Sequence, residues 1–520
     1  MGSFHRALAV SEIPPRILGP CTEGDLESLA LVCSSWKEKA QDTKWRTCEV
    51  PLKELLKKLT PFRDDNDPDE SRVFCEPDDQ ELEISDEDWS IIRHYAQKVT
   101  TMAVNAALYP NWITTIQRRL TTANQKLCPN LVAVEFKDVT EEYDLDGTLA
   151  ILAGTNLRRF SVGRDMDRDA DTIRQFDLIA DLSVHVTKID ISLFADDFTI
   201  SPDYTIFREL RQLYVHGVVW RKGWGVISDC PSLMSLTIDR RTWISLSMDG
   251  QEQQEDGRVD FFFPNLEFLS VKSPSWDKTD ATKLIPSSTM RKLQSLKVTV
   301  YDKLSYLEHL KHLHGTSPLL QSLEVDVGMV CLDPYSRVTH LEFKALRRLV
   351  LASPYSVRID DMTIGKIVSS LPELRELCIE NTPTGFTSCN HSTYLSYQGL
   401  VNLSPSCTLL EDLSISINDP IFFYVRKPCD LNYHAQALGS LRMYHLGIEE
   451  EAFEGFADWL ATFCPNMHHL EVECLTLCRS ESIGKEKIGR FIDSVFEAQR
   501  KQLLKPIPSP PKVELSSGDR

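Results

Sequence analysis

A short hydrophobic phrase recurs along most of the chain: an apolar residue, any two residues, a second apolar residue, any one residue, and a third apolar residue. The fourth and sixth positions alternate as in a β-strand, so their side chains point to one face, and the first position closes the layer beneath them. The fourteen copies are Val99-Met102-Val104, Leu131-Val134-Phe136, Leu157-Phe160-Val162, Val186-Ile189-Ile191, Leu210-Leu213-Val215, Leu233-Leu236-Ile238, Leu266-Leu269-Val271, Leu293-Leu296-Val298, Leu320-Leu323-Val325, Leu346-Leu349-Leu351, Leu374-Leu377-Ile379, Leu410-Leu413-Ile415, Leu441-Tyr444-Leu446 and Met467-Leu470-Val472.

The spacing of these copies predicts a leucine-rich-repeat solenoid, because most steps between first positions fall in or near the period of about 20–29 residues typical of such repeats. Each unit is expected to be a strand followed by a return segment that is often helical, as in Asp302–His314 and Glu451–Phe463. One unit cannot bury its apolar face alone, whereas stacked neighbours can. We therefore predict an α/β fold over residues 97–480, with a parallel sheet inside and helices outside.

The residue between the last two core positions of each phrase points away from the core and should line the concave surface of the solenoid. From the second copy onward these residues are Glu135, Ser161, Asp190, Tyr214, Thr237, Ser270, Lys297, Glu324, Val350, Cys378, Ser414, His445 and Glu471. Either they form a solvated sheet face or they bind a target protein. For target binding we single out Tyr214 and Lys297, together with Trp220 and Trp224 in a loop after a strand. Insertions at 249–260, 383–397 and 418–433 could extend this surface.

Residues 9–46 do not fit the repeat and read as a small, all-helical unit. Asp25 can cap a helix running to about Ala40. Its apolar stripe consists of Leu26, Leu29, Cys33 and Trp36, recurring at helical spacing and widened by Val32. A shorter helix before it carries Glu12-Ile13 and Ile17-Leu18.

This segment resembles the F-box. The matching residues are Glu12-Ile13, Ile17-Leu18, Asp25-Leu26, Leu29, Val32-Cys33, Trp36 and Trp45. The match departs from the family in its first half, where Ala9-Val10 stand in place of Leu-Pro and Pro14 in place of a helical Leu. With Trp89, Tyr95-Ala96 and Val99 opening the repeats, the chain looks like the fungal F-box-like proteins with irregular leucine-rich repeats.

The resemblance implies a substrate receptor of a Skp–cullin–F-box ubiquitin ligase, with a Skp-type adaptor and through it a cullin as partners, and an unknown target protein. The adaptor would be bound by Ile13, Ile17, Leu18, Leu26, Leu29, Val32, Cys33 and Trp36. The alternative is an interaction scaffold without a ligase link, in which residues 9–46 only cap the array. A third hypothesis, an enzyme or a leucine-rich GTPase activator, has no supporting motif.

The remaining segments are assigned by composition. Residues 47–96 are predicted to be a linker that contains an acidic, flexible loop at 63–88. A capping helix is expected at 481–505, and a Pro- and Ser-rich disordered tail at 506–520.

Charge and missing motifs narrow the function further. The formal net charge is −19, which disfavours nucleic-acid binding. No apolar run long enough for a membrane span and no signal peptide are visible, so we expect a cytoplasmic or nuclear protein with reduced thiols. Three cysteines, Cys128, Cys230 and Cys464, each stand three residues before a first core position and are each followed by a proline. This recurrence favours packing in the turns over metal binding. The common catalytic and phosphate-binding motifs are absent, so we expect no enzyme activity, no cofactor and no metal.

Overall fold

The computed structural model describes residues 21–32, 34–47, 50–51, 55, 84–105, 116, 119–120, 126–137, 145–152, 154–163, 185–192, 208–216, 230–238, 263–272, 289–300, 317–327, 343–353, 360–381, 395–403, 408–418, 435–447, 453–473 and 481–504. The chain forms two compact units, residues 1–293 and 294–520, which we describe separately.

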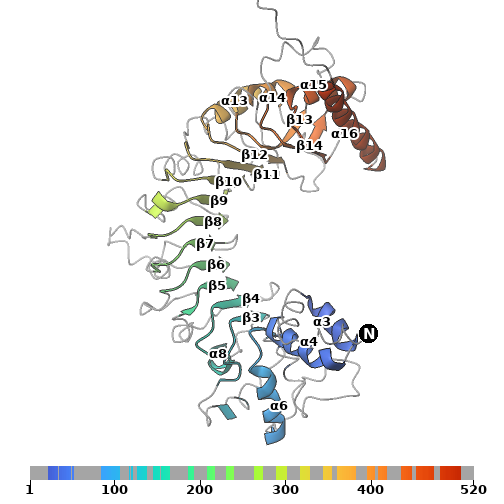
Figure 1. The fold of residues 1–520 in the computed structure, drawn as a ribbon. Helices are drawn as coiled ribbons and strands as arrows, with labels where there is room; N and C mark the ends of the chain where they lie inside the picture. The colour runs from blue at the N-terminus through green and yellow to red at the C-terminus, as the bar shows by residue number, and fades with distance from the viewer. Residues whose placement is uncertain are drawn as a thin grey trace, which may run out of the picture. The chain divides into compact units, whose positions relative to one another are not determined.

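Parallel strands make up the sheet of the first unit, and they follow one another in chain order (Figure 1). They are β1 (Val50–Pro51), β2 (Thr101–Asn105), β3 (Ala133–Lys137), β4 (Arg159–Gly163), β5 (Lys188–Ser192), β6 (Gln212–His216), β7 (Ser235–Ile238) and β8 (Phe268–Lys272). The register joins equivalent phrase positions, as in Phe160 beside Ile189 and Ile189 beside Leu213.

The second unit continues the same pattern with parallel strands in chain order. They are β9 (Ser295–Val300), β10 (Ser322–Val327), β11 (Arg348–Ser353), β12 (Glu376–Asn381), β13 (Asp412–Asn418), β14 (Ser440–Gly447) and β15 (His469–Val472). Leu296, Leu323 and Leu349 stand side by side on β9, β10 and β11. Neighbouring repeats therefore stack their phrases in one layer of core, as the sequence predicted.

Burial of the phrase positions confirms the leucine-rich-repeat solenoid. In the second unit Leu320, Leu323 and Val325 are all buried, with exposed fractions of 1%, 1% and 0%. In the first unit Leu233, Leu236 and Ile238 are equally buried. Strands thus arise wherever the phrase supplies one apolar face, and the fold class is the predicted α/β solenoid.

The turn before each strand links neighbouring repeats through hydrogen bonds. Backbone N–H groups of Val132 and Ala133 both donate to the carbonyl of Thr100, and the same pair of bonds recurs in later repeats. Asparagine side chains add a second link: Asn130 donates to the carbonyl of Gln97 over 2.8 Å, and Asn156 to that of Pro129 over 3.1 Å. Asn265 and Asn466 repeat this contact on Pro231 and Gln436. These asparagines satisfy turn carbonyls that the sheet does not reach.

The phrase assigned to β14 was wrong in phase. Leu441 and Met443 are fully buried and pair with Leu413 and Ile415, whereas Tyr444 is only partly buried. Leu438, 1% exposed, takes the first position, so the true phrase is Leu438-Leu441-Met443. A β-bulge at this point lets Leu446 return to the core beside Ile417. Arg442, which pairs with Ser414, therefore replaces His445 at the position facing away from the core.

Two helices, not one, stand near the N-terminus: α3 (Glu23–Val32) and α4 (Ser34–Thr47). They fold back on each other, because Lys44 Nζ lies 2.7 Å from Glu27 Oε1. A continuous helix would hold these residues about 25 Å apart. Thr22, not Asp25, is the N-cap of α3. The Asp25 carboxylate instead accepts hydrogen bonds from the Thr22 N–H and hydroxyl, which lower the pKa of Asp25.

The last part of the predicted linker is folded. Helix α6 (Asp86–Ala96) is capped by Ser85, whose hydroxyl accepts from the N–H of Asp88, and it buries Ile92 and Ala96. The acidic residues 86–88 thus form the first turn of a helix, where negative charge is favourable. Helix α8 (Leu145–Leu152) and the 3₁₀ turn Thr289–Lys292 also belong to the first unit.

Helices α13 (Asp361–Ser369), α14 (Tyr397–Leu403) and α15 (Phe453–Phe463) lie along one side of the second unit's strands (Figure 1). Helix α16 (Glu481–Leu503) packs against α15 at the end of the unit. Helix α15 matches the return helix expected at 451–463, while the one expected at 302–314 lies outside the described residues. Among the helices that the structure describes, none is long and apolar enough to cross a membrane.

Candidate protein-interaction surface

The strand face opposite the core, here called the open face, carries one side chain from the fifth phrase position of each repeat. In the first unit these are Ala103, Glu135, Ser161, Asp190, Tyr214, Thr237 and Ser270, each paired in register with the next. Tyr214, a predicted target-binding residue, is partly exposed between Asp190 and Thr237. Ser270 is only 3% exposed, so the expectation that it lines an accessible surface was wrong.

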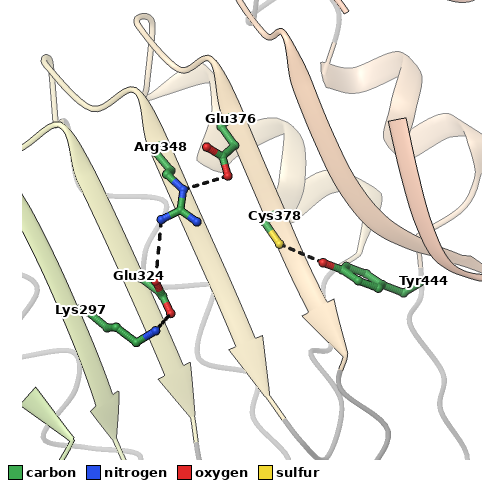
Figure 2. A network of polar contacts seen from close by, with 6 residues as sticks. All are labelled: Lys297, Glu324, Arg348, Glu376, Cys378 and Tyr444. Carbon is green, nitrogen blue, oxygen red and sulfur yellow. Dashed lines mark hydrogen bonds and ion pairs between the residues drawn. The ribbon is translucent and has the colours of Figure 1, made fainter. Parts of the chain in front are cut away.

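An ion network crosses four strands of the open face in the second unit (Figure 2). Lys297 on β9 pairs with Glu324 on β10. Glu324 Oε2 lies 3.8 Å from Arg348 Nη1 on β11, and Arg348 Nε donates to Glu376 Oε1 on β12 over 2.8 Å. Charges alternate along this line, so each cation of the network already has a carboxylate.

The network fixes the charge of its central arginine. Partial burial works against the guanidinium charge, but the hydrogen bond that Arg348 donates to Glu376 and the negative charges of Glu376 and Glu324 outweigh it and raise the pKa of Arg348. Val350, on the strand between Glu324 and Cys378, is 4% exposed. Contrary to the sequence expectation, Val350 therefore offers almost no accessible surface.

A second polar cluster lies further along the same face. The Tyr444 hydroxyl is 3.3 Å from Cys378 Sγ, as Figure 2 shows. The Arg442 guanidinium sits 5.1 Å from the Tyr444 ring centre and pairs with Glu471 over 3.3 Å and with Glu473. Rigid strands hold these groups, which lowers the entropy lost when a partner orders them.

The predicted adaptor-binding residues are only partly described. Leu26 is 1% exposed and so belongs to the interior of the α3–α4 pair, where it can support a contact but not make one. Leu29, Val32 and Trp36 lie on α3 and α4, but their side chains are outside the described part of the structure. Ile13, Ile17, Leu18 and Cys33, and the target-binding candidates Trp220 and Trp224, fall outside the described residues altogether. The insertions at 249–260, 383–397 and 418–433 do so almost entirely.

Sequence reasoning missed how the helical pair attaches to the repeats. Trp45 on α4, 7% exposed, packs against Tyr95 on α6 with 5.0 Å between ring centres. Lys98 pairs with Asp42 over 2.5 Å, and the Thr100 hydroxyl bonds the carbonyl of Arg46. Strand β1 then adds to the edge of β2. The signal for this joint was the aromatic pair itself, since Trp45 and Tyr95 both stood out in the family resemblance.

The cysteines at repeat turns are structural. Cys128, Cys230 and Cys464 are buried, and their carbonyls accept hydrogen bonds from Leu131, Leu233 and Met467, the first core residues of their phrases. Burial raises the pKa of the Cys128 and Cys464 thiols, which makes them poor nucleophiles and poor metal ligands. Within the described ranges, no group of three His, Cys, Asp or Glu side chains could hold a metal.

Comparison with known proteins finds distant similarity to solved structures. No protein-family model and no curated sequence matches the chain. An internalin of Listeria monocytogenes aligns with 14% identity and a TM-score of 0.35 over 69% of this chain and 89% of that one. A leucine-rich-repeat protein of Leptospira interrogans aligns with 10% identity and a TM-score of 0.35 over 71% and 83%. The leucine-rich-repeat protein LegL7 of Legionella pneumophila aligns with 13% identity and a TM-score of 0.24 over 53% of this chain and 92% of that one. The repeat assignment therefore rests on this chain's own strands.

Proposed function

We propose that the chain is the substrate-recognition subunit of a Skp–cullin–F-box type ubiquitin ligase. In this proposal α3 and α4, with the residues before them, dock a Skp-type adaptor and through it a cullin, and the open face of the repeats holds a target protein. The chain would act by binding alone, in the cytoplasm or nucleus, without enzyme activity, cofactor, nucleic acid or membrane.

The observation that carries the proposal is the helical pair placed directly before the repeats. The F-box-like residues Asp25, Leu26 and Trp45 fall on two helices that pack antiparallel. The Trp45–Tyr95 contact then joins this pair to the first repeat. A receptor must hold its adaptor and its target in a defined geometry, and a buried aromatic joint supplies that rigidity better than a flexible linker.

Adaptor binding is tested by co-expressing the full chain with a Skp-type protein and measuring its affinity. Trp36→Ala should weaken the complex by roughly thirtyfold, since truncating a hot-spot tryptophan commonly costs about 2 kcal/mol or more. The matched control is Tyr214→Ala on the open face, which should bind the adaptor like the wild type. An unmodified chain that binds no Skp-type protein would remove the ligase proposal.

The scaffold alternative also has a structural basis. Strand β1 covers the edge of β2, and the helical pair buries Trp45 against α6, which is how a terminal cap shields a repeat array. Trp45→Ala should lower the free energy of unfolding by about 3 kcal/mol, as for other buried tryptophans, whichever alternative holds. Adaptor binding therefore decides between the receptor and the scaffold. Trp45→Phe keeps an aromatic contact with Tyr95, so a receptor should still bind a Skp-type adaptor in this variant. A scaffold should bind no adaptor, either as the wild type or as Trp45→Phe.

Target binding is tested by proximity labelling in cells that express Tyr214→Ala. We expect loss of the target's labelling, because Tyr214 is an aromatic side chain held rigidly on the open face. The control is Met362→Ala on α13, a residue that is 65% exposed on the helical side. Loss of partners with Met362→Ala but not with Tyr214→Ala would place the target on the helices instead.

A further inference from the structure

Two cations stand side by side on the open face of the first unit. Arg159 begins β4, Lys188 begins β5, and the two are partners in the strand register. Both occupy the third position of their phrases, two residues before a fifth-position side chain, so they point to the open face with Ser161 and Asp190. Both are exposed. Neighbouring strands lie about 4.8 Å apart, so the two side chains can reach one anionic group together.

Neither cation has a carboxylate partner among the described residues. The described ion pairs in this part of the sheet are Glu135 with Lys137, 3.2 Å apart, and His185 with Glu209, 3.4 Å apart. The open face of the second unit is different, because there Lys297, Arg348 and Arg442 are all paired with glutamates. Within the described part of the first unit, no carboxylate therefore compensates the positive charge of Arg159 and Lys188, whereas glutamates compensate the comparable cations of the second unit.

A hydroxyl and two carboxylates also stand on this part of the open face. Ser161 brings a hydroxyl to the same strand as Arg159. The described carboxylates of this face are Asp190 and Glu135. Both stand at fifth phrase positions, two residues further along their strands than the third-position row of Arg159 and Lys188. An anion would thus approach from the side of Arg159 and Lys188.

We propose that Arg159 and Lys188, assisted by Ser161, bind an anionic segment of the target protein. The segment carries either clustered Asp and Glu residues or a phosphorylated side chain. An arginine binds such oxygens in a bidentate manner, a lysine supplies a point charge beside it, and a serine hydroxyl can donate a further hydrogen bond. The proposal deepens the target-binding part of the proposed function and does not depend on adaptor binding.

A protein segment fits this site better than nucleic acid does. A nucleic-acid surface needs a long row of cations that tracks a phosphate backbone. Here the two cations cover two adjacent strands, in a chain with a net charge of −19. Such a small positive site within an acidic protein selects one local anionic group rather than a polyanion.

The test uses the full chain and three fluorescent peptides: ten glutamates, a neutral peptide with one phosphoserine, and ten lysines. Binding is followed by fluorescence anisotropy at low salt. We expect the chain to bind one or both anionic peptides, and not the lysine peptide. The Arg159→Ser, Lys188→Thr double variant should weaken this binding roughly tenfold, from the loss of two exposed charge contacts. Raising the salt concentration should weaken it as well.

The matched control is Lys366→Ser with Arg500→Ser, which removes the same charge from exposed positions on α13 and α16. The control should bind both anionic peptides like the wild type. Equal weakening in the control variant would mean that net charge alone drives binding and would overturn the proposal. A single-stranded RNA of ten nucleotides is measured in the same way, and tighter binding of this RNA than of the anionic peptides would also overturn the proposal. Preference for one anionic peptide identifies the source of the anion. Adaptor affinity, measured on the same double variant, should not change, so failure here is distinct from failure of the ligase proposal.

Discussion

Asp360 couples the stability of one helix to pH. Its side chain caps α13 by accepting a hydrogen bond from the N–H of Thr363 over 2.7 Å. Hydrogen bonds from Thr363 hold the pKa of Asp360 below its usual value. A carboxyl whose folded pKa is depressed stabilises the native state above its unfolded pKa, and this contribution is lost as the pH falls through the folded pKa.

We therefore expect Asp360→Ala to lower the free energy of unfolding by about 1 kcal/mol at pH 7, the usual cost of a lost N-cap. The difference between variant and wild type should shrink below about pH 4, where the wild-type carboxyl becomes protonated. Denaturant unfolding at a series of pH values measures both effects. Asp360→Asn is the control, because asparagine also caps helices but does not titrate. A variant difference that stays constant down to pH 2 would contradict the assignment.

At the scale of single elements, strand β14 shows how hydrogen bonding selects between two hydrophobic phases. Leu438 and Leu441 can each begin an apolar phrase, and the two choices differ by three residues. The turn contacts settle the choice. The carbonyl of Gln436 accepts from Asn466 as that of Pro129 accepts from Asn156, and both carbonyls lie two residues before the first core position.

The two phases predict different mutational costs. Leu438→Ala should lower the free energy of unfolding by about 3 kcal/mol, because this side chain is 1% exposed and its removal leaves a cavity. Tyr444→Ala should cost only about 1 kcal/mol, since its ring is partly exposed beside Arg442 and Cys378. Parallel denaturant titrations of both variants compare them directly. A larger loss for Tyr444→Ala would restore the phase predicted from the sequence.

At the scale of the whole chain, a repeat array must close its ends, and α16 closes the end of the second unit. Phe491 on α16 is 1% exposed and stacks on Phe456 of α15 with 5.9 Å between ring centres. Gln499 donates to the carbonyl of Cys464 over 2.8 Å, so the helix also satisfies a backbone group at the end of α15. Without α16, the apolar side of α15 would face water.

We expect a chain truncated after residue 480 to aggregate on size-exclusion chromatography, because it exposes Phe456 and its neighbours. Phe491→Ala, which keeps the helix, should lower the free energy of unfolding by about 3 kcal/mol. A chain truncated after residue 505 retains α16 and is the control, so it should elute and melt like the full chain. Wild-type behaviour of the chain ending at residue 480 would show that α16 is dispensable as a cap.

The sequence determined the repeat positions because each phrase must bury three apolar side chains against its neighbours. That requirement is local, periodic and readable in one dimension, so thirteen of the fourteen phrases were placed in the correct phase, and the fold class followed. The cysteine turns were readable for the same reason, since their place relative to each phrase repeats. In residues 9–46, apolar periodicity indicated helices but not the point where the chain reverses between α3 and α4.

Only the tertiary structure decided which polar groups meet. The phase of β14 depends on its register with β13. The contact between Trp45 and Tyr95 brings together residues from separate helices. The ion network from Lys297 to Glu376 spans four repeats. Arg159 and Lys188 become neighbours only when their strands pair. Hydrophobic burial constrains the core positions strongly enough to leave a pattern in the sequence. Exchanging a polar residue on the open face costs less free energy than exchanging a buried apolar one, so these positions leave no comparable pattern. Their interaction partners can therefore be identified only when the strands are aligned in the structure.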